Sequence, residues 1–270
     1  MKAESRIERV ISSRQGVGLT ASVLQRSDLV LHTFVNDHPA VILLRRGRKT
    51  VKVGARKVTL HPGDAIAFAA GTICEVQNET DRGQFESTWI VCAAQILAKI
   101  EQTFPDSKKL QDFVALKGLG QEFTQSFDQG IRAIAETRLI PRGVAENRAQ
   151  EVLIWLAHRG FVFDPDEPTD LHRQVRLMVG AAPAKNWVSK EVAESFAMSE
   201  ATLRRRLADQ DHSFNAILID VRMTTALTLL QVTDSPVAEI AYKVGYDSPS
   251  RFAVRFKKHF GFSPTAVRGV

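Results

Sequence analysis

Basic and small side chains share the outward positions of two short segments near the C-terminal end, residues 199–208 and 248–261. The second segment contains four lysines or arginines and no acid. Guanidinium and ammonium groups in such a segment can bind guanine edges or phosphates, and Ser, Thr and Ala allow a close approach to bases. The chemistry that these residues could carry is therefore recognition of DNA and not catalysis.

The spacing of apolar residues predicts that residues 199–208 are the second helix of a helix-turn-helix unit. We place Ser189 as the N-cap of a short first helix and Ser199 as the N-cap of the second. Leu203 and Leu207, at i and i+4, are the expected buried pair of the second helix. The core face of the first helix is predicted to be Val192, Ala193 and Phe196.

A similar unit recurs further along the chain. Pro236 suits the first position of a helix, where its missing N–H costs nothing, and Gly245 is the expected stop. Ser248 and Pro249 open the second helix of this unit, and Gly261 ends it. Residues 214–232 predict one long connecting helix, and a short final helix opens at Ser263-Pro264. The expected core stripes are Val237, Ile240, Ala241 and Val244, then Phe252, Phe256 and Phe260.

Helical geometry predicts which side chains of the two second helices face away from the core. At about 100° per residue, Ala201, Arg205 and Ala208 lie opposite Leu203 and Leu207, flanked by Thr202 and Arg204. By the same count, Ser250, Val254 and Lys258 lie opposite Phe252 and Phe256, flanked by Arg251 and Lys257. The alternative is a plain helical bundle with solvated basic faces, but two such pairs in tandem favour DNA recognition.

The distribution of charge agrees with a nucleic-acid partner for the C-terminal part. The chain has 270 residues and a formal net charge of +6. Residues 171–270 contain 14 of the 36 Lys and Arg but only 9 of the 30 Asp and Glu. A basic excess confined to one domain is typical of nucleic-acid binding, although a solvated basic surface gives the same count.

The first part of the chain predicts a different architecture. Short apolar segments with glycine-centred turns run from about residue 19 to residue 91, as in a small antiparallel sandwich or barrel. From residue 93 to residue 160 the period becomes helical, and these helices either pack on the β unit or pair two copies of the chain. Residues 164–170, acidic and rich in proline, predict a linker. We therefore expect an α+β protein with domains at 1–163 and 171–270.

Other classes of protein are disfavoured by what the sequence lacks. Cys74 and Cys92 are too few and too far apart for a zinc motif or a disulfide framework, so we expect buried thiols in a reducing compartment. A DNA-repair enzyme with a zinc-activated cysteine is disfavoured for the same reason, and a hydrolase by the missing Gly-x-Ser-x-Gly element. Without a signal peptide or a spanning apolar run, the chain is expected to be a soluble cytoplasmic protein and not an enzyme.

At the residues of the two units, from about Leu171 to Arg268, the sequence resembles the AraC/XylS family of transcription regulators. The second unit matches at Ile240-Ala241, Val244-Gly245-Tyr246, Phe252, Arg255-Phe256-Lys257-Lys258, Phe260-Gly261, Ser263-Pro264 and Arg268. The first unit and the connecting helix match at Val192-Ala193, Met198-Ser199, Leu203, Arg205, Leu207, Ser213-Phe214, Arg222, Ala226 and Leu229-Leu230.

The resemblance implies two recognition helices that enter successive major-groove segments on one side of the DNA. The positions that touch bases in the family fall here on Ala201, Arg204, Arg205, Ser250, Ala253 and Val254. Thr202, Arg251, Lys257 and Lys258 complete the DNA-binding set that we predict. Two residues depart from the family pattern: Asp211 stands where a glycine is common, and Val254 where an arginine is common. Val254 offers only apolar contact, such as to a thymine methyl group.

The N-terminal half resembles, more loosely, the cupin-like regulatory domain found in this family, chiefly at Leu60-His61-Pro62-Gly63-Asp64. Metal-binding cupins carry an His-x-His pair, whereas His61 is followed two residues later by Gly63. His32 and His38 are isolated, and isolated histidines near strands are more often ordinary residues than ligands. No metal and no cofactor are therefore expected.

The expected function is sequence-specific binding of double-stranded promoter DNA, with activation as the family-level expectation and RNA polymerase as a partner. The input at the N-terminal domain is left open between a small molecule and a partner protein, and so is a homodimer through the helices of residues 93–160. The alternative function is that of a weakly specific architectural DNA-binding protein, for which a specificity ratio near one would be diagnostic. No membrane partner is expected.

Overall fold

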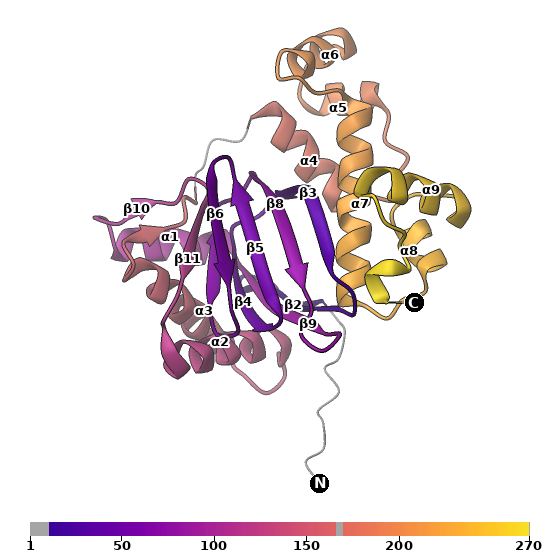
Figure 1. Ribbon diagram of the computed structural model, residues 1–270. Coiled ribbons are helices and arrows are strands. Elements are labelled where there is room, and N and C mark those ends of the chain that lie inside the picture. Colours follow the sequence, from indigo (N-terminus) through magenta and orange to yellow (C-terminus); the bar gives the residue numbers. More distant parts are fainter. Residues whose placement is uncertain (1–10, 166–169, 270) are drawn as a thin grey trace. The chain divides into compact units, whose positions relative to one another are not determined.

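The structure, a computed structural model, describes residues 11–165 and 170–269. The chain forms two compact units, both drawn in Figure 1. The first contains residues up to 166 together with 231–233 and 269, and the second contains most of the remaining residues. The predicted linker, residues 164–170, falls mainly on residues outside the described ranges, so its limits and those of the predicted domains, 1–163 and 171–270, stay a prediction. No helix in the described part of the chain is long and apolar enough to span a membrane.

The first unit is built on two β-sheets that face each other. One sheet has six strands in the order β1-β2-β9-β4-β7-β11, and the other has four in the order β3-β8-β5-β6. Their long strands pair antiparallel, as the close spacing of the turns predicts. The strands are β1 (Ser12–Arg14), β2 (Gly18–Gln25), β3 (Leu29–Asn36), β4 (Ala40–Arg46), β5 (Arg48–Val53), β6 (Arg56–Leu60), β7 (Ala65–Phe68), β8 (Thr72–Glu79) and β9 (Phe85–Cys92).

Glycine places the turn between β4 and β5. Gly47 has φ of +87°, and a Cβ at this position would lie 2.4 Å from the carbonyl oxygen of Glu79. Only glycine meets both conditions, so the strand direction reverses here and Lys49 and Val51 turn inward. The sequence predicts glycine-centred turns at residues 46–48 and 54–55, and the structure has turns there, between β4 and β5 and between β5 and β6.

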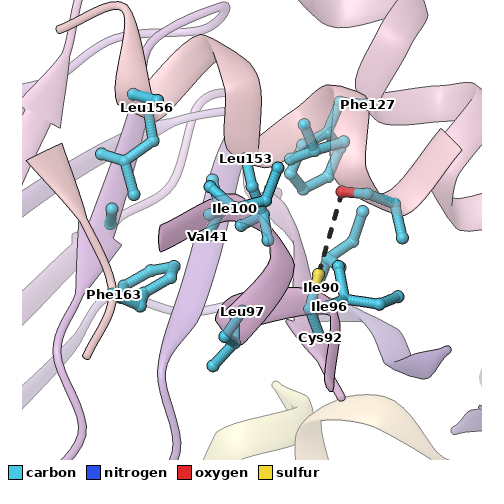
Figure 2. Close-up of a cluster of buried hydrophobic side chains, with 14 of the residues drawn as sticks. Val41, Ile90, Cys92, Ile96, Leu97, Ile100, Phe127, Leu153, Leu156 and Phe163 are labelled. Carbon is cyan, nitrogen blue, oxygen red and sulfur yellow. Dashed lines mark hydrogen bonds between the residues drawn. The ribbon is translucent and has the colours of Figure 1, made fainter. Parts of the chain in front are cut away.

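Three helices cover the outer face of the six-stranded sheet: α1 (Ala94–Thr103), α2 (Gly120–Ala135) and α3 (Arg142–Ala157). Figure 2 shows Ile96, Leu97 and Ile100 of α1 with Leu153 and Leu156 of α3 in this layer. Leu97, Ile100, Leu153, Leu156, Val162 and Phe163 enclose no space large enough for a water molecule. The apolar stripes of these helices therefore pack on the β unit of their own chain, which was the first of the two alternatives.

Two expectations for this region need correction. The helical period of the sequence predicts an apolar stripe of Ile131, Ile134 and Ala135, but Ala133 and Ile134 are buried near the end of α2 and Ala135 is exposed. The segment 93–160 is also not wholly helical, because β11 (Phe113–Leu116) joins the edge of the six-stranded sheet beside β7. A four-residue apolar run is too short for a stable helix but satisfies its backbone by pairing with a strand. Two short strands, β10 (Lys108–Lys109) and β12 (Phe161–Val162), likewise satisfy their backbone groups by pairing, in parallel, with each other.

The second unit is all helical. The long connecting helix α7 spans the predicted residues, and Ile217, Val221, Met223, Ala226 and Leu227 are buried along it. A helix that we did not predict, α4, packs Val175 and Val179 against the first helix pair. The helices are α4 (Leu171–Ala181), α5 (Ser189–Ser195), α6 (Glu200–Ala208), α7 (Phe214–Val232), α8 (Val237–Lys243), α9 (Pro249–Phe260) and a 3₁₀ turn at Ala266–Arg268.

Candidate nucleic-acid interface

The first helix-turn-helix unit consists of α5 and α6. Ser199 is the N-cap of α6, and its hydroxyl accepts a hydrogen bond from the backbone N–H of Thr202 at 3.2 Å, as predicted. Leu203 and Leu207 are buried against α5 and α4. Ser189, however, does not cap α5. Val188 is the N-cap, and its apolar side chain makes no capping hydrogen bond. The Ser189 hydroxyl, one residue later, donates to the Glu200 carboxylate at the start of α6.

The second helix-turn-helix unit consists of α8 and α9 and is built in the same way. Ser248 caps α9 and accepts from the backbone N–H of Arg251, and Pro249 occupies the first turn. Phe252, Phe256 and Phe260 form the predicted stripe, with neighbouring ring centroids 5.6 Å and 4.8 Å apart. The expected start of α8 is one residue off, since Pro236 is its N-cap and Val237 its first residue. The rings fix the rotation of α9 about its axis, and thereby the set of residues that faces outward.

The two turns between the helices close through the same pair of hydrogen bonds. In the first turn the N–H of Met198 donates to Ala193 and that of Ala197 to Glu194, both at 3.0 Å. In the second turn Tyr246 donates to Ala241 and Gly245 to Tyr242, also at 3.0 Å. This arrangement requires a left-handed residue after the helix, and the position is held by Ala197 (φ 53°) and Gly245 (φ 82°). The second turn is one residue longer before its capping serine.

Ala197→Gly is expected to stabilise the C-terminal unit by about 0.5–1 kcal/mol, because the Cβ of an L-residue is strained at positive φ. Ala197 is exposed, so the methyl group contributes little packing. Urea unfolding of the full chain followed by circular dichroism would measure this gain. Gly261→Ala is the reciprocal control: Gly261 has φ of +86° and open space where a Cβ would stand, so a loss of similar size is expected. Equal stability in both variants and the wild type would contradict the backbone argument.

The end of α6 repeats this arrangement with an acidic residue. Asp211 has φ of +59°, and the N–H of His212 donates to Leu207 at 2.8 Å while that of Asp211 donates to Ala208 at 2.9 Å. Aspartate tolerates the left-handed region better than most residues other than glycine and asparagine. The departure at Asp211 therefore leaves the turn intact, and the helix ends where a glycine would end it.

Most of the predicted DNA-binding side chains are presented to solvent on the outer faces of α6 and α9. Ala201, Arg204 and Arg205 are exposed on α6, and they border, with Thr202 and Ala208, an open hollow of about 510 Å³. On α9 the side chain of Val254 is 69% exposed, the highest value among the large apolar residues of the helical unit. Thr202 and Ala253 are half-buried, and the Thr202 hydroxyl is 2.9 Å from that of Ser199. Ser250, Arg251, Lys257 and Lys258 are exposed.

Arg222 joins the first helix-turn-helix unit to the second. Its Nε donates to the carbonyl of Pro183 and its Nη2 to that of Lys185, each at 3.0 Å, in the loop that precedes α5. Its guanidinium carbon lies 5.9 Å from the ring centre of Tyr246 in the second turn. A Cβ on Gly245 would lie 2.6 Å from Nη2 of this guanidinium, so the approach needs glycine. One side chain of α7 thus contacts both helix-turn-helix units.

A partly buried ion pair connects three helices of the C-terminal unit. Arg176 of α4, only 2% exposed, donates to Oδ2 of Asp220 on α7, and Nε2 of His259 on α9 lies 3.1 Å from Oδ1. Burial alone would raise the pKa of Asp220, but the hydrogen bond from His259 and the charge of Arg176 outweigh it and lower the pKa. The stabilisation from this carboxylate is therefore present above the ordinary pKa and lost only as pH falls through the lowered value.

Sequence reasoning missed some residues of this region. Arg206 and Arg255 are exposed beside the two predicted sets, although the helical count places them toward the core edge. Long guanidinium side chains reach solvent even from positions near the core edge of a helix. The residue type therefore predicts the exposure of these two arginines, whereas their angular position on the helix does not. The roles of Arg176 and Arg222 depend on partners distant in the sequence, and no local pattern indicates them.

Neither compact unit offers a metal centre within the described residues. No three His, Cys, Asp or Glu side chains there are placed to hold a metal ion. The His61 backbone N–H donates to Oδ2 of Asp64 at 2.9 Å, so this part of the cupin-like segment forms a turn. Both cysteines are buried free thiols, and burial raises the pKa of Cys74 to about 11 and that of Cys92 to about 12.

The comparison with protein families agrees with this geometry. A family model described as a helix-turn-helix domain matches residues 192–269, from the buried face of α5 to the last described residue. The C-terminal unit of the chain is an AraC-type helix-turn-helix domain. The resemblance to the AraC/XylS family is thereby confirmed for this part of the chain.

Two curated relatives match within the AraC-type domain. The HTH-type transcriptional regulator YdeO of Escherichia coli is 39% identical over 94 residues, which are 35% of this chain and 37% of YdeO. The transcriptional regulator SirC of Salmonella typhimurium is 39% identical over 80 residues, 30% of this chain and 27% of SirC. The chain thus spans about a third of the length of these relatives.

Solved structures match over both compact units. An apo variant of ToxT from Vibrio cholerae has a TM-score of 0.68 at 11% identity, covering 94% of this chain and 97% of ToxT. Wild-type ToxT with a bound unsaturated fatty acid has a TM-score of 0.64 at 11% identity, covering 96% and 98%. At this identity the likeness shows the fold alone, and it confirms the predicted α+β architecture with a β-rich N-terminal part and a helical C-terminal part.

Proposed function

We propose that the protein is a sequence-specific regulator of transcription that binds promoter DNA with α6 and α9 in two successive major-groove segments. The observation that carries the proposal is that the two helices have the same kind of N-cap and the same division into a buried and an exposed face. Each begins at a serine cap after the same type of turn, and each exposes small and basic residues opposite a buried apolar pair. Helices built in this way read base edges in the major groove. The two curated relatives, described as transcriptional regulators, support the proposal.

The N-terminal unit would supply the regulatory input, and we propose a small molecule as that input. ToxT, which shares the fold of both compact units, has been solved with an unsaturated fatty acid bound to it, and this supports a small molecule over a partner protein. Activation as the sign of regulation, RNA polymerase as a partner and dimer formation extend the proposal.

The experiment that tests the proposal is selection of bound fragments from genomic DNA with the full chain at a stated salt concentration near physiological. We expect a site with two short blocks about one helical turn, or roughly 10 base pairs, apart. Binding to all fragments alike, with strong salt dependence, would instead indicate a weakly specific architectural protein. The apolar Val254 at the centre of the α9 face makes the second block the weaker one of the two.

Arg205→Ala is expected to reduce affinity for the selected site by about 1–3 kcal/mol and to relax the base preference at one step. The reason is that the Arg205 guanidinium faces outward at the centre of the α6 surface, where it can bond a guanine edge. Binding curves on the site and on single-base variants would measure the effect. Arg206→Ala, which removes the same charge one residue along α6, is the matched control. Equal loss on every sequence would contradict base contact by Arg205.

Lys258→Ala is expected to weaken binding to all sequences alike and to reduce the slope of log affinity against log salt by about one, as loss of one phosphate contact does. Lys258 is exposed near the C-terminal end of α9, far along the helix from the Ser248 cap. Titrations at several salt concentrations on specific and random DNA would measure the slope. A loss confined to one sequence would show that Lys258 contacts a base.

A further inference from the structure

A chain of polar side chains crosses the interior between the two sheets of the N-terminal unit. Lys49 of β5 donates from Nζ to Oδ1 of Asn78 on the neighbouring β8 at 2.7 Å. The Asn78 amide in turn donates from Nδ2 to Oε1 of Gln25, on β2 of the opposite sheet, at 3.2 Å. All three side chains are buried: Gln25 is 1% exposed, Asn78 3% and Lys49 6%. A chain of polar side chains that begins at a buried lysine is unusual in a protein core.

The chemistry of lysine fixes the direction of this chain. An ammonium group only donates, so it must face the oxygen of the Asn78 amide, and the nitrogen of that amide must face the oxygen of Gln25. The Gln25 amide nitrogen is then left over, and it is buried with no hydrogen-bond partner. Rotating the Gln25 amide would place two donors against each other. This series of hydrogen bonds therefore begins at the charged donor of Lys49 and ends at the Gln25 amide nitrogen, a donor that lacks an acceptor.

The charge of Lys49 is also uncompensated within the described residues. No carboxylate pairs with it there, and its other contact is the face of the Phe85 ring, 5.3 Å from Nζ. Burial lowers the pKa of Lys49 to about 8, with a small opposing effect of Cys74. The other buried cation of the described chain, Arg176, has the carboxylate of Asp220 beside it. Buried charges in proteins are normally paired in this way.

We propose that Lys49 and Gln25 bind the carboxylate group of a small organic acid between the two sheets. One carboxylate oxygen would accept from the Lys49 ammonium and the other from the Gln25 amide, which supplies the missing countercharge and the missing acceptor together. A water molecule would serve the amide but not the charge, and a dianion would leave one negative charge unpaired. The hydrocarbon part of the acid would contact buried apolar residues near Lys49. These are Val51 on the same strand, Leu60, which pairs with Lys49 on β6, and Val76, which pairs with Val51 on β8.

The cluster lies at one end of the sandwich. Gln25 is the last residue of β2, Asn78 is next to last in β8, and Phe85 is the first residue of β9. The segments that leave these strands are held together by Asp28, whose Oδ1 accepts from the backbone N–H of Thr80 at 2.7 Å and from its hydroxyl at 2.8 Å. This contact is exposed, so it is a surface contact that closes the sandwich at the end where Gln25, Asn78 and Phe85 lie.

The inference gives the small-molecule input of the proposed function a location and a chemical class. Only the regulatory role of the bound acid rests on the proposed function; the binding site itself does not. Its test uses no DNA. The full chain is unfolded thermally in sodium acetate, butyrate, hexanoate and octanoate, each against sodium chloride at the same ionic strength. At least one carboxylate at saturating concentration is expected to raise Tm by about 5 °C or more above the chloride reference.

The matched variants assign the shift to the cluster. Lys49→Met and Gln25→Leu should abolish it, whereas Lys52→Met, which removes a lysine from the exposed face of the same strand, should retain it. In the wild-type chain, NMR of lysine labelled at Cε should show that the same carboxylate raises the Lys49 pKa, a readout that does not depend on how well the variants fold.

Three results would overturn the inference: no carboxylate exceeding chloride, a shift retained in Lys49→Met, or a Lys49 pKa that the carboxylate leaves unchanged. Specific DNA binding in the absence of any of these acids would leave the proposed function standing in each case. Conversely, a carboxylate shift in a chain that selects no DNA site would leave the site standing and refute the regulator.

Discussion

Replacing Asp220 by Asn is expected to lower the free energy of unfolding of the AraC-type domain by about 3–5 kcal/mol. The substitution preserves the size of the side chain but takes the carboxylate of Asp220 away from the guanidinium of Arg176, which is 2% exposed. It also removes the partner of His259 on α9. Urea unfolding of the full chain at pH 7 would show the loss in the transition of this domain.

The exposed ion pair between Glu239 and Lys243 on α8 provides the control. Both side chains are about half exposed, so Glu239→Gln should change stability by no more than about 0.5 kcal/mol. A double variant, Arg176→Met with Asp220→Asn, should lose less than the sum of the single losses, because it leaves no unpaired buried charge. Additive losses, or a small effect of Asp220→Asn alone, would contradict the role given to burial.

The second large effect concerns Lys49 and depends on pH. The stability of Lys49→Met relative to the wild type is expected to decrease by about 3 kcal/mol as pH rises from 8 to 10.5. Below pH 8 the wild-type lysine is charged in both the folded and the unfolded chain. Between about 8, its folded pKa, and 10.5, its ordinary pKa, only the unfolded chain retains the proton, so wild-type stability rises with pH. Methionine has no proton to release and lacks this rise.

The comparison must be made as a difference, because the two cysteines act in the opposite sense. Burial raises the pKa of both thiols, so above about pH 9 the unfolded chain loses thiol protons first and stability falls in both proteins. The Cys92 contribution cancels in the difference, whereas the Lys49 charge lowers the Cys74 pKa, so the Cys74 contribution cancels only in part. Urea unfolding at pH 7, 8, 9, 10 and 10.5 would give the difference, with Lys52→Met as the exposed control. A difference that does not change with pH would show that Lys49 is not a buried cation at neutral pH.

Local sequence patterns predicted the candidate interface well, because the features that build it are local. Serine caps, apolar residues at i and i+4, and glycine after a helix act within one or two turns of chain, and Ser199, Ser248 and the phenylalanine stripe of α9 are where these patterns place them. The long helix α7 has the predicted limits for the same reason. The two sheets followed from short strands and the turns at Gly47 and Gly54.

Contacts between distant residues account for what sequence patterns did not predict. Ser189 has the type and place of an N-cap, but a carboxylate from the next helix takes its hydroxyl. The four-residue strand β11 is defined by the exposed edge of β7 and not by its own pattern. In the sequence Lys49 resembles an ordinary surface lysine of a basic hairpin. Its hydrogen bond to Asn78, which in turn bonds Gln25, shows that its side chain points inward.

The position of Arg222 has a consequence for the promoters that such a protein could serve. Its guanidinium contacts the loop before α5 and the turn before α9, and one continuous helix of 19 residues, roughly 28 Å long, joins the two helix-turn-helix units. If α6 and α9 bind DNA as proposed, the two helices cannot shift relative to each other by one base pair without breaking these internal contacts. Spacing would then be a property of the protein, invariant among its binding sites. Promoters would diverge by exchanging bases within the blocks, and an insertion between them would silence a site even when every contacted base is retained.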